Sequence, residues 1–83
     1  MKKVRVLYFA GVRDLVGIPD EELVLPDEIC DLDAFVRLLV AVRPALDGRL
    51  GGVRFAVNET FAAGPDPVAA GDVIAVIPPV AGG

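Results

Sequence analysis

The sequence of 83 residues contains no histidine and no serine, and its one cysteine is Cys30. Without histidine the chain lacks the usual general acid and base, and zinc sites that combine cysteine with histidine cannot be assembled. Without serine there is no serine nucleophile, and one cysteine cannot form an internal disulfide. The sequence therefore predicts no catalytic side chains and no metal site within the chain, and it favours a reducing compartment.

An excess of basic residues is also missing, as are long hydrophobic runs. The chain has 8 basic and 12 acidic residues, a net charge of -4, which is the wrong sign for binding phosphate backbones. Arg5 and Arg13 interrupt the apolar stretch near the amino end before it reaches the length of a signal peptide's hydrophobic region. No window approaches the ~20 consecutive apolar residues of a membrane helix. We expect a cytoplasmic protein with no nucleic-acid and no membrane partner.

The chain is rich in apolar residues, which make up 54% of it, so a chain of this length can close one hydrophobic core. Alternation predicts a first strand over residues 3–10, with Val4, Val6 and Tyr8 on one face. Glycines bound residues 11–17, which we expect to form a short helical connector. Residues 21–25 are predicted to return as a second, antiparallel strand.

Apolar residues then recur at spacings of three and four over residues 31–43, which is the pattern of a helix packed on a core. Asp31 is placed to cap this helix, and Pro44 cannot extend it. Further strands are predicted over residues 53–58, 60–63 and 73–77. The apolar residues of this stripe are Leu32, Phe35, Val36, Leu39 and Val42.

The order of these elements predicts an α+β fold of the β-grasp, or ubiquitin-like, arrangement: a mixed sheet of about five strands over one main helix. The last strand is apolar on both faces, as central strands are. The first strand has the same character, so we expect the two to lie side by side. Residues 1–78 are predicted to form this domain.

Two polar features have structural interpretations. Asp20, Glu21 and Glu22 cluster at the start of the second strand, where a solvated face is the expected explanation. Cys30 follows the apolar Ile29, and we expect it to be a small buried side chain rather than a reactive thiol.

The carboxyl end has a different composition from the rest. Pro78 and Pro79 favour an extended backbone, and residues 79–83 (Pro79, Val80, Ala81, Gly82 and Gly83) are predicted to form a slender tail. Glycines without a Cβ can enter a narrow cleft of another protein. The functional group at its end is the carboxylate of Gly83, a poor electrophile that reacts only after activation, for instance by adenylation with ATP. The alternative is a frayed end that finishes in glycine.

Large apolar residues exceed what one small core can use. Phe9, Phe61 and Ile77 are the candidates left on the sheet face away from the helix. Such a surplus marks either a partner-binding surface or a better-filled core.

Three segments resemble the family of small subunits of molybdopterin synthase, the MoaD group of the MoaD/ThiS sulfur carriers. They are residues 8–17 (YFAGVRDLVG), 56–62 (AVNETFA) and 71–83 (GDVIAVIPPVAGG). The resemblance covers nearly the whole chain. It departs at Asp14, where glutamate is common, and at Val76 and Ile77, where bulky aromatics occur.

The resemblance implies a sulfur carrier in molybdenum cofactor biosynthesis. An adenylating enzyme related to ubiquitin activators would use ATP to form an acyl-adenylate at Gly83, which sulfur converts to a thiocarboxylate. The carrier would then dock on the large synthase subunit, in a heterotetramer, and pass sulfur to cyclic pyranopterin monophosphate. No cofactor would be bound by the chain itself. The resemblance assigns docking to Phe9, Phe61 and Ile77, and matches Arg13 to a basic position of the family.

Three other functions are left open by the sequence. The chain could be the related sulfur carrier of the thiamine pathway, although that group has a shorter amino end. It could be a ubiquitin-like modifier, or a sulfur donor to another biosynthesis. It could also be a β-grasp interaction module without terminal chemistry.

Overall fold

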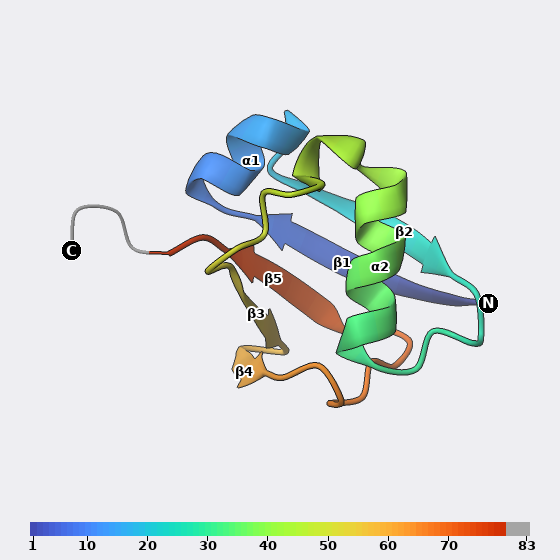
Figure 1. Ribbon diagram of the computed structural model, residues 1–83. Helices are drawn as coiled ribbons and strands as arrows, with labels where there is room; N and C mark the ends of the chain where they lie inside the picture. Colours follow the sequence, from blue (N-terminus) through green and yellow to red (C-terminus); the bar gives the residue numbers. More distant parts are fainter. Residues whose placement is uncertain (80–83) are drawn as a thin grey trace.

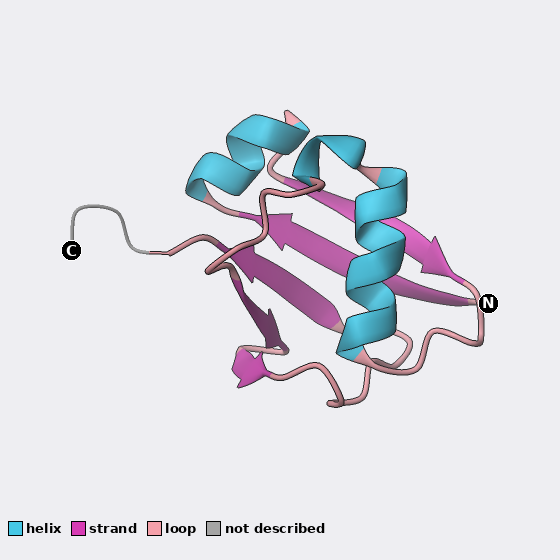
Figure 2. Cartoon of the chain, viewed as in Figure 1, coloured by secondary structure: helices cyan, strands magenta, loops and turns pink. Residues whose placement is uncertain are grey.

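A five-stranded mixed sheet carries both α-helices on one of its faces (Figures 1 and 2). The computed structural model describes residues 1–79. Its elements are β1 (Lys2–Tyr8), α1 (Ala10–Val16), β2 (Asp20–Leu25), α2 (Leu32–Val42), a 3₁₀ turn (Pro44–Leu46), β3 (Arg54–Val57), β4 (Thr60–Ala62) and β5 (Val73–Ile77). The predicted strands and main helix are confirmed, with bounds that differ by at most two residues.

The strands lie in the order β2-β1-β5-β3-β4. β1 pairs antiparallel with β2 and parallel with β5, and β5 pairs antiparallel with β3. The last strand therefore lies beside the first, as its two apolar faces predicted. The architecture is the ubiquitin-like β-grasp fold.

α2 forms for the reasons that its sequence gives. The Asp31 side chain accepts a hydrogen bond from the backbone N–H of Ala34 at 2.8 Å, which satisfies one of the free donors at the helix start. The helix ends at Val42, two residues before Pro44. Leu32, Phe35 and Leu39 face the sheet and are buried. Their spacing places all three on one side of the helix, and this side covers the core.

The core lies between the sheet and the helices. β1 contributes Val4, Val6 and Tyr8, the face that the alternation predicted, and α1 adds Val12. The other buried core side chains are Leu25, Leu32, Phe35, Leu39, Leu46, Val68, Ile74 and Val76. Truncating a large side chain here, such as Phe35, would cost about 3 to 5 kcal/mol of stability.

Asp20, Glu21 and Glu22 were expected to form a solvated face at the start of β2. That expectation was wrong for Glu21. Val6 pairs with Glu21 in the sheet register, and Glu21 therefore points to the helix side with a side chain only 13% exposed. Arg43 Nε donates to Glu21 Oε2 at 2.8 Å, Arg43 Nη2 donates to Oε1, and Tyr8 Oη donates to Oε2 at 2.5 Å. The cluster ties β1 and β2 to the end of α2.

These contacts change the ionisation of both acidic groups. The hydrogen bonds from Arg43 lower the pKa of Glu21, and outweigh the opposing effect of burial. Burial raises the pKa of Tyr8 well above its usual value, and the hydrogen bond to Glu21 adds to this effect. Glu21 is therefore held ionised and Tyr8 neutral.

Cys30 is exposed, so the expectation of a small buried side chain was wrong. It lies in the loop before α2, with its Sγ 3.4 Å from the carbonyl oxygen of Asp27. Its neighbour Ile29 packs against the core instead. A loop has no fixed period, so the sequence could not decide which of the two side chains turns inward.

Replacing Glu21 by Gln should destabilise the protein by about 1 to 2 kcal/mol at neutral pH, because the charge-assisted hydrogen bonds weaken. The pKa of Glu21 is lowered on folding, so its contribution is complete above the ordinary value of 4.5 and is lost as the pH falls through the folded pKa. The stability difference between the two proteins should therefore shrink below about pH 4.5. Urea unfolding at neutral pH and near pH 3 measures this difference.

Glu22→Gln is the matched control, since Glu22 is exposed and lies 3.9 Å from Lys3 in a surface ion pair. It should change stability by less than about 0.5 kcal/mol. Equal effects of the two substitutions would contradict a structural role for the Glu21 cluster.

Candidate functional site

The sheet face away from the helices carries a row of side chains aligned across four strands. The register pairs Leu7 with Ala75, Ala75 with Ala56, and Ala56 with Phe61. Side chains alternate between the two faces of a strand, so this row faces away from the core that β1, β5 and β3 also help to build. The small side chains in the middle leave a depression between the larger ones at its ends.

That depression is a hollow of about 280 Å³, which we call the outer groove. Phe9 and Phe61 are 45% and 56% exposed at its sides, and Ile77 is half-buried in it. The structure thus brings together the three residues that the sequence had singled out. The full lining is Leu7, Phe9, Ala56, Glu59, Phe61, Val73, Ala75 and Ile77.

Leu7, Val73 and Ala75 belong to the outer groove but were not singled out from the sequence. The signal was present in the alternation, since Leu7 shares a face with Phe9, and Val73 and Ala75 share one with Ile77. A count of surplus large residues missed Ala75 because its side chain is small. Ala75 contributes the depth of the groove.

Ionic side chains border the outer groove on the β1–β2 side of the sheet. Arg5 Nη2 lies 2.9 Å from Asp20 Oδ1, and Lys3 Nζ lies 3.9 Å from Glu22 Oε1, both pairs diagonal across the β1–β2 register. On the β3–β4 side, the Arg54 guanidinium lies 3.9 Å above the centre of the Phe61 ring, as a cation–π contact. Charged side chains therefore lie on both sides of the apolar groove.

The lining of the outer groove is almost entirely apolar. Glu59 is the one ionisable side chain in its lining. In the part of the chain that the structure describes, no three metal-ligating side chains gather anywhere. Among residues 1–79, no helix is long and apolar enough to cross a membrane.

Arg13 does not join this surface. It is exposed on α1, and α1 packs Val12 into the core on the opposite side of the sheet. Its backbone N–H donates to the carbonyl oxygen of Phe9 at 3.3 Å, so Arg13 lies one helical turn from Phe9 but on the helix side of the sheet.

The predicted tail begins where β5 ends, beside the outer groove. Pro79 is exposed, and Pro78 and Pro79 line a hollow of about 520 Å³ with α1 and the loop before β3. A Cβ built on Gly52 in that loop would touch the Pro79 ring at 3.5 Å, so the loop packs against the base of the tail. Val80, Ala81, Gly82 and Gly83 lie outside the described residues.

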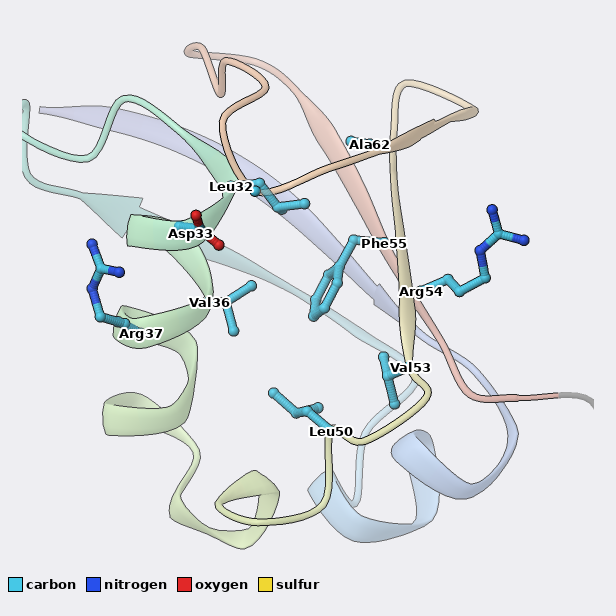
Figure 3. Close-up of a pocket in the computed structure, with 10 residues that line it drawn as sticks. Leu32, Asp33, Val36, Arg37, Leu50, Val53, Arg54, Phe55 and Ala62 are labelled. Atoms are coloured by element: carbon cyan, nitrogen blue, oxygen red, sulfur yellow. The ribbon is translucent and has the colours of Figure 1, made fainter.

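A third hollow, of about 430 Å³, opens between α2 and β3 on the helix side (Figure 3). Leu32, Val36 and Phe55 point into it, whereas Arg37 and Arg54 point away from its centre. Asp33 also lines it, so its lining is mixed, and the sheet separates it from the outer groove. It adds nothing to the surface beside the tail.

Curated proteins of one name are similar to the chain over nearly its whole length. The molybdopterin synthase sulfur carrier subunit of Chlamydomonas reinhardtii is 34% identical over 83 residues, which cover 98% of this chain and 99% of that protein. The human protein of the same name is 33% identical over 84 residues, covering 98% of this chain and 94% of its own length.

Solved structures also resemble the chain over nearly its whole length. Small archaeal modifier protein 1 from Haloferax volcanii superposes with a TM-score of 0.87 at 26% identity, covering 98% of this chain and 99% of that one. A chain in the complex of subunits 1 and 2 of molybdopterin-converting factor from Helicobacter pylori has a TM-score of 0.68 at 26% identity, with 98% and 99% covered. A model of the ThiS family matches residues 6–83. The chain belongs to the ThiS family.

Proposed function

We propose that this chain is the sulfur carrier subunit of a molybdopterin synthase. The observation that carries the proposal is similarity over the full length to curated proteins of that name, at 34% and 33% identity. The solved complex of the two subunits of a Helicobacter pylori molybdopterin-converting factor supports a second subunit as the docking partner. The outer groove is the surface that we assign to that contact.

The geometry supports a carrier that docks at the same end of the molecule from which its tail leaves. Phe9 and Ile77 lie at the end of the outer groove where β5 leads into the tail, so a protein bound there lies beside the tail's base. Exposed aromatic side chains in a hollow are typical anchors of protein interfaces. Four residues after Pro79 can span at most about 14 Å when extended, enough to reach a cleft in a docked partner.

The chemistry is assigned to the carboxylate of Gly83. An adenylating enzyme would first join it to the AMP portion of ATP, with loss of pyrophosphate, and the acyl-adenylate is the electrophile that a free carboxylate is not. A sulfide-level nucleophile from the sulfur donor would then attack the acyl carbon, with AMP as the leaving group, to give a thiocarboxylate. The partner subunit would supply the site in which this sulfur passes to cyclic pyranopterin monophosphate. The absence of histidine and serine agrees with a chain that carries the reacting group and leaves acid–base work to its partners.

A second candidate is a protein modifier, in which Gly83 becomes joined to a lysine of a target. The likeness to small archaeal modifier protein 1 favours it, with a TM-score of 0.87. Both functions begin with the same activated acyl group, so the two differ in the acceptor: sulfur in one case and an amine in the other.

Deleting Gly83 should abolish molybdopterin formation in a reconstituted system of carrier, adenylating enzyme, sulfur donor and large subunit. The reason is that the reactive acyl group is displaced from its position by one residue. The deletion variant should unfold at the same temperature as the intact chain and still bind the large subunit through the outer groove. Undiminished molybdopterin formation by the deletion variant would contradict the assignment of chemistry to Gly83.

Replacing Phe61 by Ser should weaken binding to the large subunit about tenfold or more, because an aromatic anchor is lost from the outer groove. Val24→Ser is the matched control, since Val24 is 50% exposed on the edge strand β2, away from the groove. Its affinity should stay within about twofold of the unchanged chain. Calorimetric titration measures both. Equal affinities for the two variants would remove the outer groove from the proposal.

Replacing Cys30 by Ser should leave sulfur transfer intact, because the sulfur travels on the terminal acyl group. The Cys30 side chain is exposed, so the substitution should also leave stability nearly unchanged. The check is the rate of molybdopterin formation in the reconstituted system. A variant that folds normally but transfers no sulfur would show that a persulfide on Cys30 is the carrier instead.

A further inference from the structure

The outer groove has opposite charges at its two ends. Glu59 lines it at the end where β5 begins, in the turn between β3 and β4. Arg54 stands at the other end, paired in register with Ile77, where β5 leads toward the tail. Arg54 and Ala56 lie on the same face of β3, so the guanidinium stands on the groove side of the sheet, over the Phe61 ring. The apolar floor therefore lies between a cation and an anion.

Both charges are available to a partner. Within residues 1–79, no carboxylate pairs with Arg54 and no cation pairs with Glu59, although Arg5 and Lys3 on the same face are both paired. The two cannot reach each other easily, since the three steps from Arg54 to Val57 alone take about 10 Å of strand. Glu59 follows Asn58, whose side chain ties the turn to the start of β5: Asn58 Nδ2 donates to Asp72 Oδ1 at 2.9 Å, and Asn58 Oδ1 accepts from the Val73 N–H at 2.9 Å.

We propose that Arg54 and Glu59 orient the docked protein on the outer groove. The partner, which is the large synthase subunit if the proposed function holds, would present an apolar ridge with a carboxylate facing Arg54 and a basic side chain facing Glu59. An apolar strip alone accepts a ridge in either direction, whereas opposite charges at its ends disfavour the reversed complex. The direction matters because the tail leaves from the Arg54 end, so a reversed partner would hold its active site away from Gly83.

The test is a charge swap, Arg54→Glu with Glu59→Arg, which keeps the net charge at -4 and reverses the polarity of the groove. Binding to the purified large subunit from the same organism should weaken about tenfold or more, with a slower association rate. Adding salt should narrow the difference from the unchanged chain, because screening weakens both the attraction and the repulsion. Stopped-flow association at low and high salt measures the rates.

A second swap, Arg37→Glu with Glu28→Arg, is the matched control. Both residues are exposed, neither lines the outer groove, and the net charge is again unchanged. This control should associate within about twofold of the unchanged chain. A groove swap that binds as well as the control swap would overturn the proposal.

Arg54→Lys separates charge from ring packing. It keeps the cation but not the planar group that stacks on Phe61, and should bind within about threefold of the unchanged chain if charge orients the partner. A loss as large as that of the groove swap would overturn the orienting role and leave Arg54 as a support for the ring.

The outcomes also separate this inference from the proposed function on which it rests. If Phe61→Ser weakens binding and the groove swap does not, the inference is wrong and the docking surface stands. If the unchanged chain does not bind the large subunit, the proposed function is wrong and the inference falls with it. A second copy of the chain, reversed on the same groove, would match the charges before and after the swap. The chain with the groove swap could therefore still associate with itself. If it does so and binds the large subunit as well as before, the occupant of the groove is a second copy of the chain and the proposal is overturned.

Discussion

The parallel pairing of β1 with β5 determines where both the core and the outer groove form. It places β5 inside the sheet, with Ile74 and Val76 in the core under the helices. The alternate residues of the same strand, Val73, Ala75 and Ile77, then form the floor of the outer groove. A slip of one residue would exchange the two sets and leave the core with a gap where Ile74 and Val76 pack. The core and the outer groove are therefore built from the two faces of one strand.

Much of the fold could be predicted because local periodicity encodes it. The spacing of Leu32, Phe35 and Leu39 indicated the helix, and the two apolar faces of residues 73–77 indicated a central strand. The Glu21 cluster could not be found in this way. It depends on which residue of β1 lies opposite Glu21 and on where α2 ends, and neither is a property of a single segment.

The candidate site was predicted in part, for a similar reason. Phe9, Phe61 and Ile77 are far apart in sequence, and a count of surplus apolar residues was enough to place them outside the core. The stacking of Arg54 on Phe61 requires the hairpin register and was missed. Arg13, matched by resemblance alone, lies on the helix side of the sheet and stays a prediction without support from the groove. The roles of Pro79 and of residues 80–83 also stay predictions.

The proposed function divides the work between the outer groove, which docks, and the carboxyl end, where the acyl group of Gly83 carries the sulfur. The most direct measurement is the mass of the intact chain purified from its native host, followed by fragmentation to locate any change. If Gly83 carries the sulfur, a population of the chain should have one oxygen of the Gly83 carboxylate replaced by sulfur. Sulfur found on Cys30, with an unaltered Gly83 throughout, would contradict it.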